Sequence, residues 1–238
     1  MNQLAIPAKA STIIIVRRQA GDGFEVLMTR RRQEMQFLAG FLVFPGGAVE
    51  NEDCSERMLA RCRGLTPLAA DRILGGDISP EISLAHWVAA IRELFEETGI
   101  HFFVNQDGEM PDRSRAGLKR LEEKRKSLSQ RALDLPQLLE SERLFCDLGR
   151  LTYLFHRITP EKHPVRFATR FYLAALPENQ TALSCSEEVS ESLWLTPKLA
   201  MAEAESGNFS MMPPTVIALR TLADHASWPK LCAAFHLR

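Results

Sequence analysis

The sequence has little net charge and no long apolar run. Its 238 residues carry 29 lysines and arginines against 30 aspartates and glutamates, so the formal net charge is −1. A chain so balanced has no global field to attract a polyanion, and we expect neither a nucleic-acid nor a membrane partner. The longest early apolar run, Ile13 to Val16, has the length of a strand and is too short for a signal peptide or a membrane span.

Cysteine is scarce and follows no known pattern. The five cysteines are odd in number, widely spread and without a Cys-x-x-Cys pair, namely Cys54, Cys62, Cys146, Cys185 and Cys232. This spacing excludes the common zinc and dithiol motifs and favours a reducing compartment. We therefore expect a cytoplasmic protein.

What is present is the composition of an ordinary globular protein, with 45% hydrophobic and 25% charged residues. Strand-forming segments alternate irregularly with helical ones, which favours an α/β fold with a mixed sheet between helical layers. The expected strands cover residues 12–16, 25–29, 41–44, 100–104, 151–155, 167–174 and 192–195, and the expected helices cover 80–98, 197–205 and 214–225. We predict a single domain over residues 1–238, with inserts at about 54–79 and, as a helical hairpin, at about 110–145.

The helix at residues 80–98 has the clearest local signals. Ser79 can cap its N-terminus, Pro80 suits its first position and Gly99 can close its C-terminus. An apolar stripe predicts the face that packs against the core, formed by Leu84, Val88, Ile91 and Phe95.

Three glutamates lie nearly opposite that stripe. At about 100° per residue, Glu93, Glu96 and Glu97 fall within one arc of the helix. Like charges this close repel, and oxygen ligands of this kind suit Mg²⁺ or Mn²⁺. For an isolated glutamate pair a solvated acidic face would be the better interpretation. Here, however, Pro45-Gly46-Gly47 stands upstream, where two glycines predict a sharp turn and a close approach of the backbone to a ligand.

Gly47 and residues 92–100 together resemble the box of the Nudix hydrolases. That box reads Gly, five residues, Glu, seven residues, then Arg-Glu-aliphatic-x-Glu-Glu-x-Gly-aliphatic. Its second half is matched at every specified position by Arg92-Glu93-Leu94-Phe95-Glu96-Glu97-Thr98-Gly99-Ile100. The first half departs, because Asp53 stands where the box has Glu, and 38 residues (54–91) stand where it has seven. Asp53, Glu50 or Glu52 could replace the missing glutamate. The resemblance implies an α/β/α sandwich of the Nudix type.

The interrupted box is similar to that of the peroxisomal coenzyme A diphosphatases. A second signature of that subgroup is partly present, with the right spacing, in Leu27-Met28-Thr29-Arg30-Arg31, Gly40 and Phe44-Pro45-Gly46-Gly47. Arg32 and Gln36 replace two of its residues. The resemblance implies a hydrolase that cleaves the phosphoanhydride of coenzyme A or acyl-coenzyme A to 3′,5′-ADP and (acyl-)4′-phosphopantetheine. Two alternatives stay open: a Nudix diphosphatase for another nucleoside diphosphate derivative, such as ADP-ribose or NADH, and a non-catalytic phosphate-ligand sensor on the same fold.

The resemblance also implies roles for residues of the box. It implies a Mg²⁺ or Mn²⁺ site whose ligands are Glu93, Glu96, Glu97 and the carbonyl of Gly47. Arg92 would hold the carboxylates in place, since it is four residues from Glu96. Some members of the family use a further glutamate from a later loop as ligand or base, for which Glu188 is the first candidate and Glu187 the second.

Substrate binding is expected beside the glycines. Arg30 and Arg31 could pair with phosphates near the backbone of Gly46 and Gly47. Because alternate residues of a strand face one side, at most two of the arginines 30–32 can reach the site. The basic stretch 113–131 is better interpreted as a solvated helix face than as a site for the 3′-phosphate of coenzyme A. The sequence leaves open whether the chain forms a homodimer.

Overall fold

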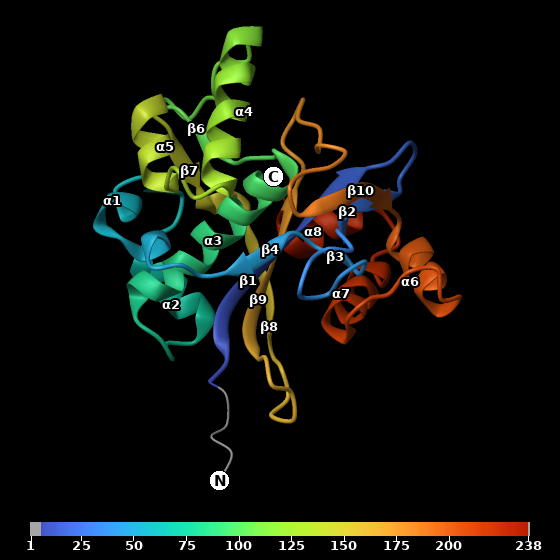
Figure 1. Cartoon of the computed structure of the whole chain (residues 1–238). Coiled ribbons are helices and arrows are strands. Elements are labelled where there is room, and N and C mark those ends of the chain that lie inside the picture. The colour runs from blue at the N-terminus through green and yellow to red at the C-terminus, as the bar shows by residue number, and fades with distance from the viewer. Residues whose placement is uncertain (1–5, 238) are drawn as a thin grey trace.

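Strand β1 (Ala8–Arg18) determines the layered architecture, because its successive apolar residues face opposite sides. Ile13 and Ile15 belong to one hydrophobic core, whereas Ile14 and Val16 belong to another. The computed structural model, which describes residues 6–237, is accordingly a mixed sheet between two layers of helices (Figure 1). The predicted α/β fold with a mixed sheet is confirmed.

Within the described residues the main sheet has seven strands. The strands β10 (Val189–Leu195), β2 (Phe24–Arg31), β1, β9 (Phe167–Ala175) and β8 (Thr152–Ile158) lie side by side in that order. The short strands β3 (Leu42–Val43) and β4 (Gly46–Ala48) pair with β2 and β1. β1 and β9 run parallel, while the other pairs are antiparallel. This topology places β4 against the central strand of the sheet.

The two helical layers differ in size. One face of the sheet is covered by α3 (Pro80–Thr98) and the elements around it, and the other by α6 (Pro197–Glu205), α7 (Pro213–Ala223) and α8 (Trp228–Phe235) (Figure 1). The caps of α3 are as predicted, since the Ser79 hydroxyl accepts from the Ile82 amide and Gly99 has a φ of 74°. The apolar stripe is buried, but His86 and Trp87 are buried too, so α3 is enclosed on more sides than an amphipathic pattern predicts.

Two segments surround α3. The first comprises η1 (Glu52–Cys54), α1 (Glu56–Leu59), β5 (Cys62–Arg63) and α2 (Pro67–Leu74). The second comprises α4 (Arg115–Ser129) and α5 (Leu135–Glu142), followed by β7 (Phe145–Asp147) and η2 (Leu148–Arg150). β5, β7 and β6 (Phe103–Val104) form a separate three-stranded sheet. Met58, Ala70 and Leu138 from these segments are fully buried in the core around α3, so both segments are part of the packed structure.

Some local expectations are wrong. Pro45-Gly46-Gly47 does not form a sharp turn: Gly46–Ala48 is the strand β4, which pairs with residues 10–12 of β1. The strand expected at 100–104 is reduced to β6, which lies in the small sheet. β5 and β7 are not predicted, since strands of two or three residues have no usable periodicity. The helix α8 is not predicted either. Within residues 6–237, no helix combines the length and the apolar character needed to cross a membrane.

Candidate active site

Arg92 is the centre of a polar cluster on the C-terminal half of α3. Its side chain is only 6% exposed. Nε and Nη2 donate to the two carboxylate oxygens of Asp53, each at 3.0 Å, and Nη2 also donates to the Ala48 carbonyl at 2.8 Å. Nη1 donates to Glu93 at 2.9 Å and to Glu96 at 3.2 Å. All five donors of the guanidinium are used within the protein, so Arg92 positions carboxylates and has no donor left for a substrate.

Asp53 is the acidic residue that faces Arg92. Its carboxylate is buried and also accepts from the Glu50 amide at 2.8 Å. Burial raises the pKa of Asp53, and Arg92 acts in the opposite direction. The Glu50 side chain instead pairs with Arg131 at 3.0 Å, and Glu52 is exposed. Of the three acidic residues considered from the sequence, Asp53 is the one that connects the two halves of the interrupted box.

Glu97 is buried between α3 and the sheet. The Gly46 amide donates to its Oε1 at 3.3 Å, and the Thr29 hydroxyl donates to its Oε2 at 3.4 Å. Sequence reasoning assigns no role to Thr29, although it lies in the second signature, at residues 27–31. The contact joins that signature to the box.

Gly47 permits a close approach of Glu93 to the backbone of β4. A Cβ atom at position 47 would collide with the Glu93 carboxylate, and one at position 46 would collide with the Ser11 carbonyl. Both glycines are therefore required for close packing within the protein, although they lie in an extended strand and have no positive φ.

The protein only partly stabilises the ionised forms of the three glutamates. Burial raises the pKa of Glu93 to about 7, and the neighbouring Glu96 adds to this. Burial also raises the pKa of Glu96, and it raises the pKa of Glu97 well above its usual range with a contribution from Glu93. Oxygen donors of this kind fit a hard divalent cation, whose charge would favour their ionised forms.

The carboxylates are not arranged as a finished metal cluster. In the part of the chain that the structure describes, no three His, Cys, Asp or Glu side chains are placed to hold one ion. Arg92 draws Glu93 and Glu96 together, whereas the Gly46 amide holds Glu97 on the sheet side. The donor chemistry therefore fits Mg²⁺ or Mn²⁺, and binding requires the glutamates to turn toward one another.

Arg31 lies beside the glutamates. Its Nη2 is 3.5 Å from Glu188 Oε2, and its Nε donates to the Phe37 carbonyl at 3.1 Å. The positive charge of Arg31 opposes the rise in the pKa of Glu97, and the negative charge of Glu188 contributes to that rise. The predicted residues Arg31 and Glu188 thus lie near the box.

Arg30 has other surroundings, as the alternation of side chains along β2 requires, and so does Arg32, the residue that follows β2. Arg30 pairs with Glu191 at 3.2 Å and lies over the ring of Phe209, 5.1 Å from its centroid. Arg32 donates to the Ser186 carbonyl through Nε and Nη2, at 2.9 and 2.8 Å. The structure therefore does not bring Arg30 together with the box glutamates.

Glu187, the second candidate in the later loop, faces the helical insert. Its carboxylate lies 3.6 Å from Nη1 of Arg125 on α4. Glu188 is the residue of the two that lies beside Arg31.

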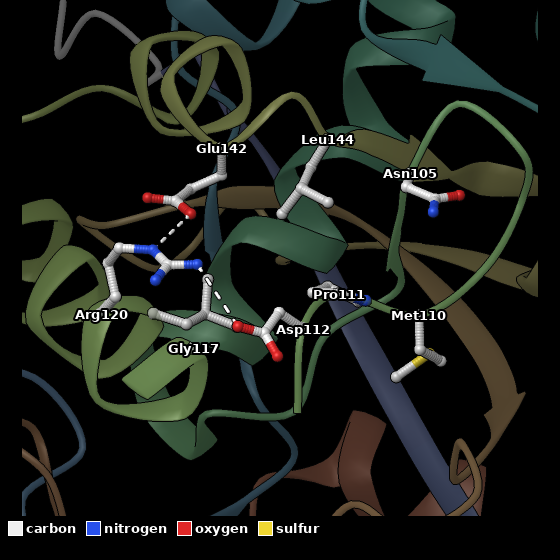
Figure 2. A pocket seen from close by; sticks show the side chains of 9 residues that line it. Asn105, Met110, Pro111, Asp112, Gly117, Arg120, Glu142 and Leu144 are labelled. Carbon is white, nitrogen blue, oxygen red and sulfur yellow. Dashed lines mark hydrogen bonds and ion pairs between the residues drawn. The ribbon is translucent and has the colours of Figure 1, made fainter. Parts of the chain in front are cut away.

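The insert has basic residues that are engaged by acidic ones. Figure 2 shows Arg120 of α4, whose Nε donates to Glu142 at 3.0 Å and whose Nη2 is 3.8 Å from Asp112. These side chains border a cavity of about 130 Å³ between α4, α5 and the loop at 105–112. None of the residues that line this cavity belongs to the box. The interpretation of residues 113–131 as a solvated helix face holds for Arg120, which is 49% exposed, but it is wrong for Arg125, whose side chain is only 3% exposed.

The family model described as the NUDT19 Nudix domain matches residues 4–222. The chain belongs to this family of Nudix hydrolases. The crystal structure of a Nudix hydrolase from Alicyclobacillus acidocaldarius superposes on this Nudix domain with a TM-score of 0.73 and 28% identity. The match covers 95% of this chain and 96% of that one, which agrees with the layered architecture described above.

Two curated relatives are similar over most of this Nudix domain. Nudix hydrolase 7 of Caenorhabditis elegans is 28% identical over 215 residues, which is 88% of this chain and 59% of the relative. The acyl-coenzyme A diphosphatase NUDT19 of Xenopus laevis is 24% identical over 231 residues, which is 85% of this chain and 60% of the relative. The chain thus spans about three-fifths of the length of these relatives.

Proposed function

We propose that this Nudix domain is a metal-dependent diphosphatase that cleaves coenzyme A or acyl-coenzyme A to 3′,5′-ADP and (acyl-)4′-phosphopantetheine. The observation that carries the proposal is the contact of Glu97 with both Thr29 and Gly46, because it unites the second signature with the box in one site. The X. laevis relative, named an acyl-coenzyme A diphosphatase, supports the same substrate class. The proposal includes a single catalytic domain with its two inserts and, from the cysteine pattern, a cytoplasmic location.

The metal would be held by the box. The residues that would bind Mg²⁺ or Mn²⁺ are Glu93, Glu96, Glu97 and the carbonyl of Gly47. When bound, the ion neutralises charge on the diphosphate and makes a water molecule more acidic. Arg92 holds two of the glutamates through Nη1, and the Gly46 amide holds the third. The two Nη1 contacts keep the carboxylates of Glu93 and Glu96 together against their mutual repulsion.

Arg31 and Glu188 complete the proposed chemistry. The Arg31 guanidinium places positive charge beside the glutamates, where the diphosphate must lie, and it can pair with a phosphate in bidentate fashion. Glu188 contacts Arg31 through Oε2, and its side chain is 55% exposed. Its Oε1 can therefore accept the proton of the attacking water.

A product-resolved assay tests the substrate. Coenzyme A, an acyl-coenzyme A, ADP-ribose and NADH are supplied in parallel with Mg²⁺ or Mn²⁺, and the products are identified by mass spectrometry. We expect 3′,5′-ADP from coenzyme A well ahead of the other products. A preference for ADP-ribose or NADH would support the diphosphatase reaction but reject coenzyme A as the substrate. Ligand-induced thermal stabilisation without any turnover would favour a phosphate-ligand sensor.

The Glu96→Gln variant tests the catalytic site. Loss of even an outer-shell partner of a metal ligand costs 10- to 100-fold, so removing a ligand should lower turnover by more than about 100-fold. The control is Glu123→Gln on α4, because Glu123 is a mostly exposed glutamate paired with Lys119. Wild-type turnover in Glu96→Gln would end the assignment of the box as the catalytic site.

A further inference from the structure

The C-terminal turn of α3 has a local excess of negative charge. It carries Glu96 and Glu97, and it contains no basic residue. The last carbonyl groups of a helix form the negative end of its dipole, which is stabilised by cations and destabilised by carboxylates. The end of α3 that bears the proposed metal ligands therefore needs stabilisation from elsewhere in the chain.

Arg125 of α4 supplies that stabilisation. Its Nη1 donates to the Glu96 carbonyl oxygen at 2.6 Å. The Ile100 amide, which would be the regular helical donor to this carbonyl, instead donates to the Thr98 hydroxyl at 3.2 Å. The Arg125 side chain is only 3% exposed. It acts as a C-terminal cap for α3 that comes from a different helix.

Two further contacts hold Arg125 in place. Its Nε and Nη2 donate to the two oxygens of Glu122, one turn earlier on α4, at 2.9 Å each. Nη1 also lies 3.6 Å from Glu187, in the loop that leads to β10. Glu187 is the neighbour of Glu188, the proposed base. One guanidinium thus links the insert, the end of α3 and the loop that carries Glu188.

We propose that Arg125 is a positioning residue, through which the helical insert holds the C-terminal turn of α3 and with it the glutamates of that turn. Its effect on turnover rests on the proposed function, whereas its effect on α3 does not. A role in packing alone would lower the stability of the whole domain evenly. The positioning role instead loosens the end of α3 more than its first half.

Hydrogen exchange in the full chain distinguishes these roles. The test variant is Arg125→Gln, and the control is Lys119→Gln, because Lys119 is on the same helix and 78% exposed. A hydrogen bond to a charged group is strong enough that its loss should speed exchange of the amides at 96–104 by about tenfold. Amides at 84–91 should keep their exchange rates. The Arg125→Gln enzyme should also show a lower kcat with little change in KM.

The outcomes separate this inference from the proposed function. Unchanged exchange at 96–104 in Arg125→Gln would overturn it, whether or not the wild-type protein hydrolyses coenzyme A. Faster exchange in a chain without diphosphatase activity would support it and reject the proposed function. If Arg125→Gln does not fold, Glu122→Gln serves the same test, because it leaves Arg125 present but poorly held. Exchange at 96–104 that matches the wild type in that variant would also overturn the inference.

Discussion

Arg92 and Asp53 are joined by two parallel hydrogen bonds of 3.0 Å, although 39 positions separate them in the chain. Both side chains are buried. Charges removed from water are tolerated only when they are paired and their remaining hydrogen bonds are made. Here the remaining donors of Arg92 bind the Ala48 carbonyl and two glutamates of α3. The residues at the two ends of the interruption therefore contact each other and bring the two halves of the box together.

Removal of the Asp53 charge should weaken the domain and its activity together. The Asp53→Ala variant leaves Arg92 short of its bidentate partner, and breaking a buried pair in this way should cost about 3 kcal/mol of the free energy of unfolding. Turnover should fall at least about tenfold, because Arg92 also orients Glu93 and Glu96. Urea unfolding and an activity assay measure both effects. Glu52→Ala is the exposed control, and a larger loss in that variant would show that Asp53 is not the counterpart of the box glutamate.

A methyl group at position 47 should affect activity more than stability. Gly47→Ala places Cβ against the Glu93 carboxylate, which Arg92 holds in place. A displacement of about 1 Å in a reacting site can lower the rate about 100-fold. Gly23→Ala is the matched control, because the only close contact of its Cβ would be with Oε1 at the end of the flexible Gln19 side chain. Equal turnover in the two variants would show that the close approach of Glu93 to Gly47 does not matter for activity.

The two arginines at the end of β2 should differ in their effect on substrate binding. Arg31→Met removes the charge beside Glu97 and should raise KM for coenzyme A by about tenfold or more, the cost of one charged hydrogen bond. Arg30→Met should change KM by less than about twofold, because Arg30 is engaged with Glu191 and Phe209. Steady-state kinetics of both variants measure KM for coenzyme A. A larger KM effect in Arg30→Met would reverse the assignment of the two residues.

His86 is a buried histidine that stays neutral in the folded protein. Its Nε2 accepts from Arg170 Nη1 at 2.8 Å, because a guanidinium can only donate, so its proton lies on Nδ1 and is donated to Ser11 Oγ at 2.9 Å. Burial and the positive Arg170 lower the pKa of His86 to about 3. His156 and Lys9 act in the same direction, and a hydrogen bond with the Ala10 backbone opposes it.

This histidine should reduce stability in acid. The unfolded chain takes up the proton at about pH 6.5 and the folded protein only near pH 3, so protonation favours the unfolded state between these values. His86 should therefore lower the free energy of unfolding by up to about 1.4 kcal/mol for each pH unit in that window. Urea unfolding at several pH values should show a shallower decline for His86→Gln. If the free energy of unfolding declines equally with pH in the wild type and in His86→Gln, another group causes the loss of stability in acid.

Features that depend on neighbours along the chain could be predicted from the sequence. Ser79 and Gly99 bound α3 as predicted, because a cap acts within one turn of its helix. The shared face of Glu93, Glu96 and Glu97 follows from helical periodicity alone. The extended geometry of Gly46–Gly47 was beyond such reasoning, because it depends on pairing with β1.

Contacts between groups far apart in the chain are visible in the folded protein alone. Asp53 pairs with Arg92, Arg31 lies beside Glu188, and Arg125 lies at the end of α3. Each of these contacts depends on which face of a helix, strand or loop is oriented toward α3. Local sequence does not specify this orientation, because it results from the packing of the sheet and the inserts around one buried helix.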